Sequence, residues 1–598
     1  MDFKQKAEEK KMSMSKNIAR LAVTAGLTAA LSFGGVMAPV TMAFAEGKPV
    51  ATQTGKVTIK DNIYMDTTFK GIQIFKATVT QNKDGNTWSG DKTLSDIDWA
   101  SPEVKNVVTS AFTGVAEAPA ADAGAQAWAK YINDYAGDNV GETAKVDAGS
   151  TLDKIAAALE DSTLIWTQPS DPTTGEYNAL AAGYWLFVTA QSGSTKGTDT
   201  ANGNDDAYTS PIFTIVGGAD VNAEPKKDVP NVTKAVKDDK NGSFVTDASK
   251  NVFEAPNRVA DSASDQLIEY QLAGTVASNI NSYKEYSYTF TDDLPSTMVP
   301  ELVDSKPVVE VKIGDKTVKP EYYDVQYNTT KNELVVSFDN LKKEIKSDKG
   351  EVITVSGSSK IYVNYKAKIN PAKVNADMLG KGQKNTVTLT YSNNPHSNEN
   401  ENETGTTVVH PAYDYTYGID VKKVGSDETK PPLENVEFTL QEVGTEKFIK
   451  MDGTTANSET EEGAILRTNA AGTIEVFGLD EGTYILKEKT PAPGYDNSHG
   501  NKGIKFTIAR GVTLPERDNT VVNPKLQVND ADDQNLVTAV DATDGMVHLT
   551  VTDKKGSGLP LTGLNGVTFT WIAGGAVLCI GVAHLIRSRK QAEEPEQE

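Results

Sequence analysis

Cysteine is nearly absent from this sequence. The single cysteine, Cys579, lies in an apolar run near the C-terminus. A disulfide within the chain needs two cysteines and a Cys-ligated zinc site needs several, so both are excluded, as is a soluble thiol nucleophile. If the chain folds outside the cell, another covalent device must take the place of disulfides.

Histidine and the common catalytic motifs are also scarce. The five histidines are scattered, without the spacing of an HExxH site, and there is no GxSxG or P-loop sequence. Acidic clusters at 202–206 and 529–535 lack the glycine and glutamate spacing of an EF-hand, which favours solvated loops. We therefore predict no cofactor, no metal site and no enzyme activity on an external substrate.

Positive charge is in deficit. The chain has 59 Lys and Arg against 82 Asp and Glu, a formal net charge of −23. Such a chain repels phosphate backbones, and no basic patch interrupts the acidity, so we predict no nucleic-acid binding. A hydrophobic share of 38% is too high for an acidic disordered protein. The length corresponds to about three or four folded domains.

An apolar stretch follows the basic residues near the N-terminus. It occupies residues 18–45 and ends on the small-x-small sequence AFA at 43–45. A basic region, an apolar core and a small-residue cleavage site are the parts of a secretory signal peptide. We therefore predict that residues 1–45 are removed and that the mature chain begins at Glu46.

A second apolar segment lies near the C-terminus, at 567–586, and a basic tail follows it. At ~1.5 Å per residue the segment spans about 30 Å, the thickness of a bilayer core. The residues LPLTG precede it: Leu559, Pro560, Leu561, Thr562 and Gly563. The whole of 557–598 resembles the cell-wall sorting signal of Gram-positive surface proteins. This resemblance implies that a sortase cleaves after Thr562 and that the protein is secreted and anchored to the cell wall.

Between these ends the sequence indicates short strands separated by Gly, Asn, Asp and Pro. Period-2 alternation is frequent and long helical periodicity is rare, which predicts an all-β fold of tandem Ig-like sandwiches. We place three domains at 46–223, 224–410 and 411–556. The first also has helical apolar spacing at 128–135 and 152–159, which predicts short packing helices.

The third domain resembles the CnaB-type domain of Gram-positive surface proteins and pilins. The matching segments are IDVKKV, PPLENVEFTL, GTIEVFGLDEGTYILKEKTPAPGY and VHLTVTDKK. The resemblance implies an internal Lys–Asn or Lys–Asp isopeptide bond, and YILKEKTPAPGY resembles the pilin E-box, whose glutamate is Glu488 here. Strand alternation favours Lys423 over Lys422 as the inward amine. It also favours Asp553 as the partner, with Asn523 as the alternative.

The second domain resembles, more loosely, the CnaA-type domain in the middle of three-domain backbone pilins. PNVTKAV supplies Lys234, YTFTDDLP supplies the acid Asp292, and NTVTLTYSNNP supplies the partner Asn385. Asn385 is favoured over Asn393 if the first and last strands run parallel. Strand alternation favours Asp292 over Asp293. In both domains the chemistry needs an unprotonated amine beside a protonated acid, and an apolar core favours both states.

The linker VNAEPKKDVPNVTK resembles the pilin motif V-x-V-Y-P-K-N, whose lysine joins subunits. Val221, Pro225 and Lys226 match the motif, while Glu224 and Lys227 stand where the motif has tyrosine and asparagine. We assign Lys226 as the polymerising lysine, with Lys227 as the alternative.

These resemblances together point to the major backbone subunit of sortase-assembled pili. They imply that Lys226 of one subunit attacks the acyl-enzyme formed on Thr562 of another, and that the pilus supports adhesion. The expected partners are pilus-specific and housekeeping sortases, other copies of the chain, minor tip or base pilins, and peptidoglycan. The expected chemistry of the chain itself is limited to its own isopeptide bonds. The alternative is a singly wall-anchored monomeric adhesin that binds a host or matrix ligand.

Overall fold

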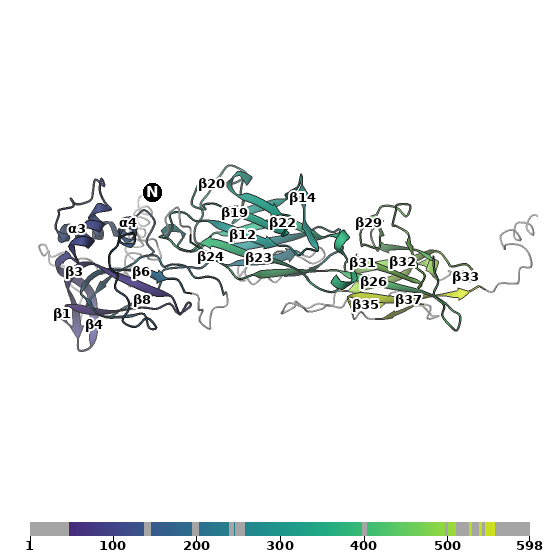
Figure 1. Cartoon of the computed structure of the whole chain (residues 1–598), viewed down its shortest axis with the longest axis horizontal. Coiled ribbons are helices and arrows are strands. Elements are labelled where there is room, and N and C mark those ends of the chain that lie inside the picture. Colours follow the sequence, from purple (N-terminus) through teal and green to yellow (C-terminus); the bar gives the residue numbers. More distant parts are fainter. Residues whose placement is uncertain are drawn as a thin grey trace, which may run out of the picture. The chain divides into compact units, whose positions relative to one another are not determined.

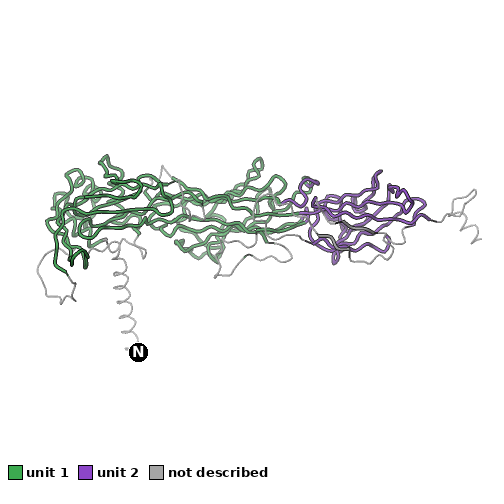
Figure 2. Tube along the Cα trace, turned by 90° about the horizontal axis from the view of Figure 1, so that it is seen from below, with its two compact units in different colours: residues 1–262, 266–373, 382–415 green, residues 263–265, 374–381, 416–598 purple. Residues whose placement is uncertain are grey.

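The computed structural model describes most of the chain between residues 47 and 556, and strands dominate it. The described residues are 47–136, 145–193, 203–237, 244, 258–396, 403–496, 500–509, 525–528, 537–540 and 544–556. They form two compact units, coloured in Figure 2. The first unit comprises the chain to residue 262 with 266–373 and 382–415, and the second comprises 263–265, 374–381 and the chain from 416.

Strand pairing in the first unit gives two successive sandwiches, and the second unit holds a third. We call them the first sandwich (47–223), the second sandwich (232–415) and the third sandwich (416–556). The tandem β-sandwich fold predicted from the sequence is confirmed.

The first sandwich pairs a five-stranded sheet with a three-stranded one (Figure 1). The large sheet has the order β1-β3-β6-β7, with β4 on β3, and the small one has the order β5-β2-β8. The strands are β1 (Lys48–Thr52), β2 (Thr54–Ile59), β3 (Thr68–Asp84), β4 (Thr87–Trp99), β5 (Glu176–Ala181), β6 (Gly183–Gln191), β7 (Ile212–Val216) and β8 (Val221–Ala223).

Strand β6 is buried along most of its length because both faces of its sheet are covered. Leu186 packs in a cluster with Trp128 of helix α3 (Ala125–Ala136) and Ile155 of helix α4 (Thr151–Glu160). Its neighbour Phe187 points the other way and packs in a cluster with Val57 of β2. A strand covered on both sides is expected to be a continuous apolar run, as YWLFV is here.

Three helices cover the outer face of the large sheet: α2 (Pro102–Ser110), α3 (Ala125–Ala136) and α4 (Thr151–Glu160). The two helices predicted from apolar spacing correspond to α3 and α4, so that prediction is confirmed. Helix α2 was not predicted. Its signal was the sequence SPE, in which the Ser101 hydroxyl caps the helix by accepting a hydrogen bond from the Val104 N–H at 3.2 Å.

The second sandwich has two large sheets. One has the order β10-β25-β23-β12-β19-β18 with β24 on β23, and the other has the order β17-β16-β22-β11-β9 with β13 on β22. The main strands are β9 (Val232–Lys237), β10 (Val259–Asp261), β11 (Ile268–Thr275), β12 (Tyr288–Asp293), β13 (Met298–Pro300), β16 (Val309–Ile313), β17 (Lys316–Thr317), β18 (Asp324–Asn328), β19 (Glu333–Phe338), β22 (Lys360–Ile369), β23 (Gln383–Ser392), β24 (Thr404–Thr406) and β25 (His410–Tyr415). Two small hairpins join β14 (Leu302–Val303) to β15 (Lys306–Pro307) and β20 (Ile345–Lys346) to β21 (Val352–Ile353).

The third sandwich also has two sheets. One has the order β31-β26-β37-β33 with β36 on β37, and the other has the order β29-β28-β27-β32-β34-β35 with β30 on β27. The strands are β26 (Tyr417–Gly425), β27 (Glu437–Glu442), β28 (Phe448–Ile449), β29 (Thr455–Ala456), β30 (Leu466–Arg467), β31 (Thr473–Leu479), β32 (Gly482–Thr490), β33 (Tyr495–Asp496), β34 (Ile504–Ala509), β35 (Lys525–Val528), β36 (Val537–Val540) and β37 (Met546–Lys555). Strands β26 and β37, the first and last, pair in parallel.

Candidate functional site

Lys423 is the centre of a buried polar cluster in the third sandwich. Lys422 is exposed on β26, whereas Lys423 points into the interior. The Lys423 amine donates a hydrogen bond to Glu488 Oε2 at 2.7 Å and also contacts Asp553 Oδ1. The side chains of Lys423, Glu488 and Asp553 are 0%, 0% and 2% exposed. The three residues predicted to act together are therefore in contact.

The strand register explains how these residues meet. In the parallel pair β26–β37, Lys423 lies opposite Val551 and Gly425 lies opposite Asp553. Asp553 is thus one diagonal step from Lys423 on the same face of the sheet. Glu488 reaches the amine from β32, in the facing sheet.

The electrostatics of this cluster favour a neutral acid. Burial raises the pKa of Glu488 to about 7; Lys423 opposes the rise and Asp553 adds to it. Glu488 Oε1 and Asp553 Oδ2 are buried and have no hydrogen-bond partner among the described residues. A proton on Glu488 reduces the cost of burying these oxygens. The arrangement suits attack of an amine on a carboxyl carbon.

The second sandwich contains a similar cluster around Lys234. The Lys234 amine lies 2.8 Å from Asn385 Oδ1 and 3.0 Å from the Tyr365 hydroxyl, and it also contacts Asp292 Oδ2. Lys234 is 1% exposed, Asp292 and Asn385 are 0% exposed, and Tyr365 is 3% exposed. Burial lowers the pKa of Lys234 to about 8 and raises the pKa of Asp292. Both shifts favour the neutral forms that amide formation needs.

The route by which Lys234 and Asn385 meet differs from the one expected. Strands β9 and β23 belong to opposite sheets, and β24 and β25 follow β23. The two residues therefore meet across the interior of the sandwich, not along neighbouring parallel first and last strands. Asp293 is exposed, as alternation predicts for the neighbour of Asp292.

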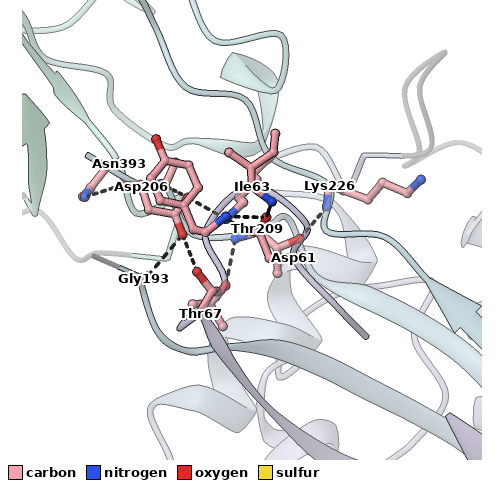
Figure 3. Close-up of polar contacts among 12 residues, drawn as sticks. Asp61, Ile63, Thr67, Gly193, Asp206, Thr209, Lys226 and Asn393 are labelled. Atoms are coloured by element: carbon pink, nitrogen blue, oxygen red, sulfur yellow. Dashed lines mark hydrogen bonds and ion pairs between the residues drawn. The ribbon is translucent and has the colours of Figure 1, made fainter. Parts of the chain in front are cut away.

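Asn393, the alternative partner, lies away from this cluster. Its Nδ2 donates to the Asp206 backbone carbonyl at 3.1 Å, and the Asn393 backbone carbonyl accepts from the Tyr208 N–H at 2.7 Å. It thus joins the 204–209 segment of the first sandwich to the second (Figure 3). The structure does not bring it to Lys234.

The two linker lysines have different surroundings. The Lys227 side chain is 8% exposed; its amine lies 2.5 Å from Asp206 Oδ1 and also contacts Asp61 Oδ2. Lys226 is partly exposed, and its backbone N–H donates to Thr209 Oγ1 at 2.7 Å. Figure 3 shows the Lys226 side chain extending away from the contacts around Asp206. Within the described part of the chain, its amine has no ion-pair partner.

Other hydrogen bonds fix Asp61 and Asp206 in place around the Lys227 amine. Asp61 Oδ1 accepts from the N–H groups of Ile63 and Tyr64, and Asp206 Oδ2 accepts from the Thr67 hydroxyl. Neither this ion cluster nor the presence of Tyr365 in the Lys234 cluster was predicted, although the alternation in KIYVNYKAKI places Tyr365 on the inward face.

Several predicted features lie outside the described residues. They are Asn523, the signal peptide 1–45, the sorting residues Leu559, Pro560, Leu561, Thr562 and Gly563, and the apolar segment 567–586. None of the helices in the described ranges is long and apolar enough to cross a membrane. The described residues also contain no group of three or more His, Cys, Asp or Glu placed to hold a metal ion.

Part of the third sandwich matches a known family. Residues 418–520, which include Lys423 and Glu488, match the family described as SpaA, a prealbumin-like fold domain. No curated protein matches the chain.

Solved structures similar to the chain include three pilins. The T6 backbone pilin of serotype M6 Streptococcus pyogenes has 16% identity and a TM-score of 0.46, over 86% of this chain and 100% of that one. The full-length major pilin SpaD from Corynebacterium diphtheriae has 15% identity and a TM-score of 0.40, over 84% of this chain and 98% of that one. The major pilin subunit BcpA of Bacillus cereus has 16% identity and a TM-score of 0.34, over 65% of this chain and 90% of that one.

Proposed function

We propose that this chain is the backbone subunit of a covalent pilus on a Gram-positive cell surface, with one domain for each of the three sandwiches. The observation that carries the proposal is the contrast between the two linker lysines. Lys226 matches the pilin motif, and among the described residues its amine has no ion-pair partner, whereas the Lys227 amine contacts two buried aspartates. A nucleophile that must reach a sortase acyl-enzyme needs a free, accessible amine.

The polymerising reaction is an acyl transfer. A sortase thiolate cleaves the Thr562–Gly563 bond and holds the Thr562 carbonyl as a thioester. The unprotonated Lys226 amine of another subunit attacks that carbonyl, an amide forms, and the thiol leaves. The last subunit is transferred to peptidoglycan by the same chemistry, with a housekeeping sortase, and minor pilins join at the tip or base. The chain is a substrate in these steps, not an enzyme.

The two buried clusters would close the intramolecular bonds. In the third sandwich the Lys423 amine attacks the Asp553 carboxyl carbon, Glu488 shuttles the proton, and water leaves. In the second sandwich the Lys234 amine attacks the Asn385 amide carbon, Asp292 takes part in proton transfer, and ammonia leaves. The short contacts and burial of both amines support this chemistry.

The test is polymerisation in a Gram-positive host that supplies the cognate sortases. Cell-wall extracts of the wild type should contain a ladder of very large species, and Lys226→Ala and Lys226→Arg should both leave wall-linked monomer. The arginine variant keeps the charge but removes the primary amine. Lys154→Arg, at an exposed site on α4, is the matched control and should keep the ladder.

Three outcomes separate the alternatives. Ladders that persist in Lys226→Arg but disappear in Lys227→Arg would move the assignment to Lys227. Ladders that persist in the double variant would refute the linker assignment. Wall-linked monomer without any ladder in the wild type would favour the singly anchored adhesin.

A further inference from the structure

We propose that Tyr365 is a catalytic residue for the bond in the second sandwich, where its hydroxyl relays a proton from Asp292 to the departing nitrogen of Asn385. The inference rests on the proposed Lys234–Asn385 bond. It adds a residue and a proton path that neither the sequence motifs nor the comparisons identify.

The position of the hydroxyl is the first argument. Tyr365 Oη lies 2.9 Å from Asp292 Oδ1, 2.8 Å from Asn385 Nδ2 and 3.0 Å from Lys234 Nζ. It therefore touches the acid, the leaving group and the nucleophile. A hydroxyl can donate one hydrogen bond and accept two, so these three contacts use its full capacity.

The lack of another route is the second argument. Among the described residues no hydrogen bond joins Asp292 to Asn385 directly. Asp292 Oδ2 faces Lys234, and Oδ1 accepts from Tyr365. A proton that leaves Asp292 for the amide nitrogen therefore passes through the Tyr365 hydroxyl.

The sandwich holds this hydroxyl rigidly. Lys234 and Tyr365 come from one sheet, on β9 and β22, while Asp292 and Asn385 come from the facing sheet, on β12 and β23. The ring of Tyr365 stacks on Tyr270, with centroids 5.4 Å apart and planes 15° apart. Burial raises the pKa of Tyr365 well above its usual value, which keeps the proton on the hydroxyl. A protonated hydroxyl can pass a proton on only by receiving another.

The proposed step balances as follows. The neutral Lys234 amine attacks the Asn385 carbonyl carbon, and the new C–N bond converts the planar amide into a tetrahedral centre. Nζ loses one proton to Asp292 Oδ2. Asp292 gives the proton on Oδ1 to Tyr365 Oη, and the tyrosine gives its own proton to Asn385 Nδ2. The old C–N bond then breaks, ammonia leaves, and both Asp292 and Tyr365 end in their starting protonation states.

The hydroxyl must reverse its hydrogen bonds during this step. A planar amide nitrogen is a donor, so Asn385 Nδ2 donates to Tyr365 at the start. In the tetrahedral intermediate that nitrogen is pyramidal and carries a lone pair, so it can accept. Rotation about the single C–O bond of the tyrosine is enough to turn the donor toward it.

The third sandwich shows why the relay is specific to an asparagine partner. The aromatic ring beside the Lys423 amine is Phe438, with its centroid 5.6 Å away, and phenylalanine has no hydroxyl. There Glu488 and Asp553 both contact the Lys423 amine, and the leaving group of the proposed bond is water. An amide nitrogen is a poorer leaving group than a carboxyl oxygen. Departure of ammonia therefore depends more strongly on a hydroxyl that can donate a proton to that nitrogen.

The experiment uses the full chain, pulse-labelled in a host that secretes it, with tryptic maps taken at intervals. The bonded form gives a cross-linked peptide that joins Lys234 to Asn385 and is lighter by one ammonia. Tyr365→Phe should slow its appearance on the order of 100-fold, the usual scale for loss of a general acid. The Lys423–Asp553 peptide should form at the wild-type rate and so report that the chain is folded. Tyr288→Phe is the matched control, since its buried hydroxyl donates to the Thr275 carbonyl, outside the cluster.

A second measurement covers the case in which Tyr365→Phe fails to fold. Fluorotyrosine placed at position 365 keeps the shape of the ring but makes the hydroxyl more acidic, and the rate of bond formation should change. An unchanged rate, or a wild-type rate in a folded Tyr365→Phe chain, would overturn the relay and leave the bond itself intact. A wild-type chain that never forms the Lys234–Asn385 peptide would instead refute the proposed bond.

Discussion

Glu488→Gln offers the sharpest test of the third sandwich. Glutamine has nearly the same shape as glutamate but cannot exchange a proton, so Lys423 and Asp553 should stay in contact and unreacted. The expected result is loss of the cross-linked tryptic peptide, with Lys423 becoming a cleavage site after denaturation. The reasoning depends on the 2.7 Å contact between the amine and Glu488 Oε2.

The size of the effect follows from the loop that the bond closes. Lys423 and Asp553 are separated by 130 residues. By the chain-entropy estimate used for disulfides, a cross-link over such a loop stabilises the folded state by about 5 kcal/mol. In a domain of this size, that loss should lower the unfolding temperature by roughly 10–20 °C.

The assay is differential scanning calorimetry of the wild type and the variant, combined with peptide mapping. Glu475→Gln, an exposed glutamate on β31, is the control and should change neither result. A Glu488→Gln chain that still contains the Lys423–Asp553 peptide would refute the role of Glu488. A wild-type mass without loss of water, but with loss of ammonia at Lys423, would move the partner to Asn523.

Three further predictions concern charge. Lys227→Met should lower the stability of the first unit by about 3–5 kcal/mol, because it leaves buried Asp61 and Asp206 without their cation, while Lys226→Met should change little in thermal unfolding. The rate of Lys423–Asp553 bond formation in newly folded chain should fall as the pH rises through about 7, because Glu488 loses the proton it must donate; a rate that keeps rising with pH would contradict this. His396 Nδ1 and Glu160 Oε2 lie 3.2 Å apart, and the two residues should have opposite effects on how the free energy of unfolding changes with pH. Burial lowers the pKa of His396 to about 4, so the stability that the neutral imidazole gives the fold is lost as the pH falls toward 4. Burial raises the pKa of Glu160 to about 7, so the stability that the protonated carboxyl gives the fold is lost as the pH rises toward 7. In Glu160→Gln the free energy of unfolding of the first unit should therefore fall more steeply with falling pH, by up to about 1.4 kcal/mol per pH unit between pH 7 and pH 4. Denaturant titrations at several pH values would measure this slope.

Strand alternation explains why much of each cluster could be predicted from the sequence. A period of two decides which of two neighbours points inward, and this distinguishes Lys423 from Lys422 and Asp292 from Asp293. The family-like motifs supplied the third member of each cluster. Whether the bonds form stays a prediction.

Contacts between sheets could not be predicted in the same way. Alternation places Tyr365 inside, but only the pairing of β22 with β11, and the facing of the two sheets, puts its hydroxyl between Asp292 and Asn385. The same limit applies to the linker. Lys226 and Lys227 lie in an irregular segment, so no periodicity could say which amine Asp61 and Asp206 would hold.

The placement of Lys234 and Lys423 near the start of their sandwiches has a mechanical consequence. In a polymer joined from Lys226 to Thr562, tension enters each subunit at Lys226 and leaves near its C-terminus. If both internal bonds close, that tension passes from Lys234 to Asn385 and from Lys423 to Asp553, so residues 235–384 and 424–552 carry none of it. The first sandwich precedes Lys226 in the chain, so the covalent connection from subunit to subunit does not pass through it and it carries no tension. A pulled fibre should therefore lengthen only through the segments outside those two loops, 227–233, 386–422 and 554–562, and the first sandwich could unfold or vary without weakening the shaft.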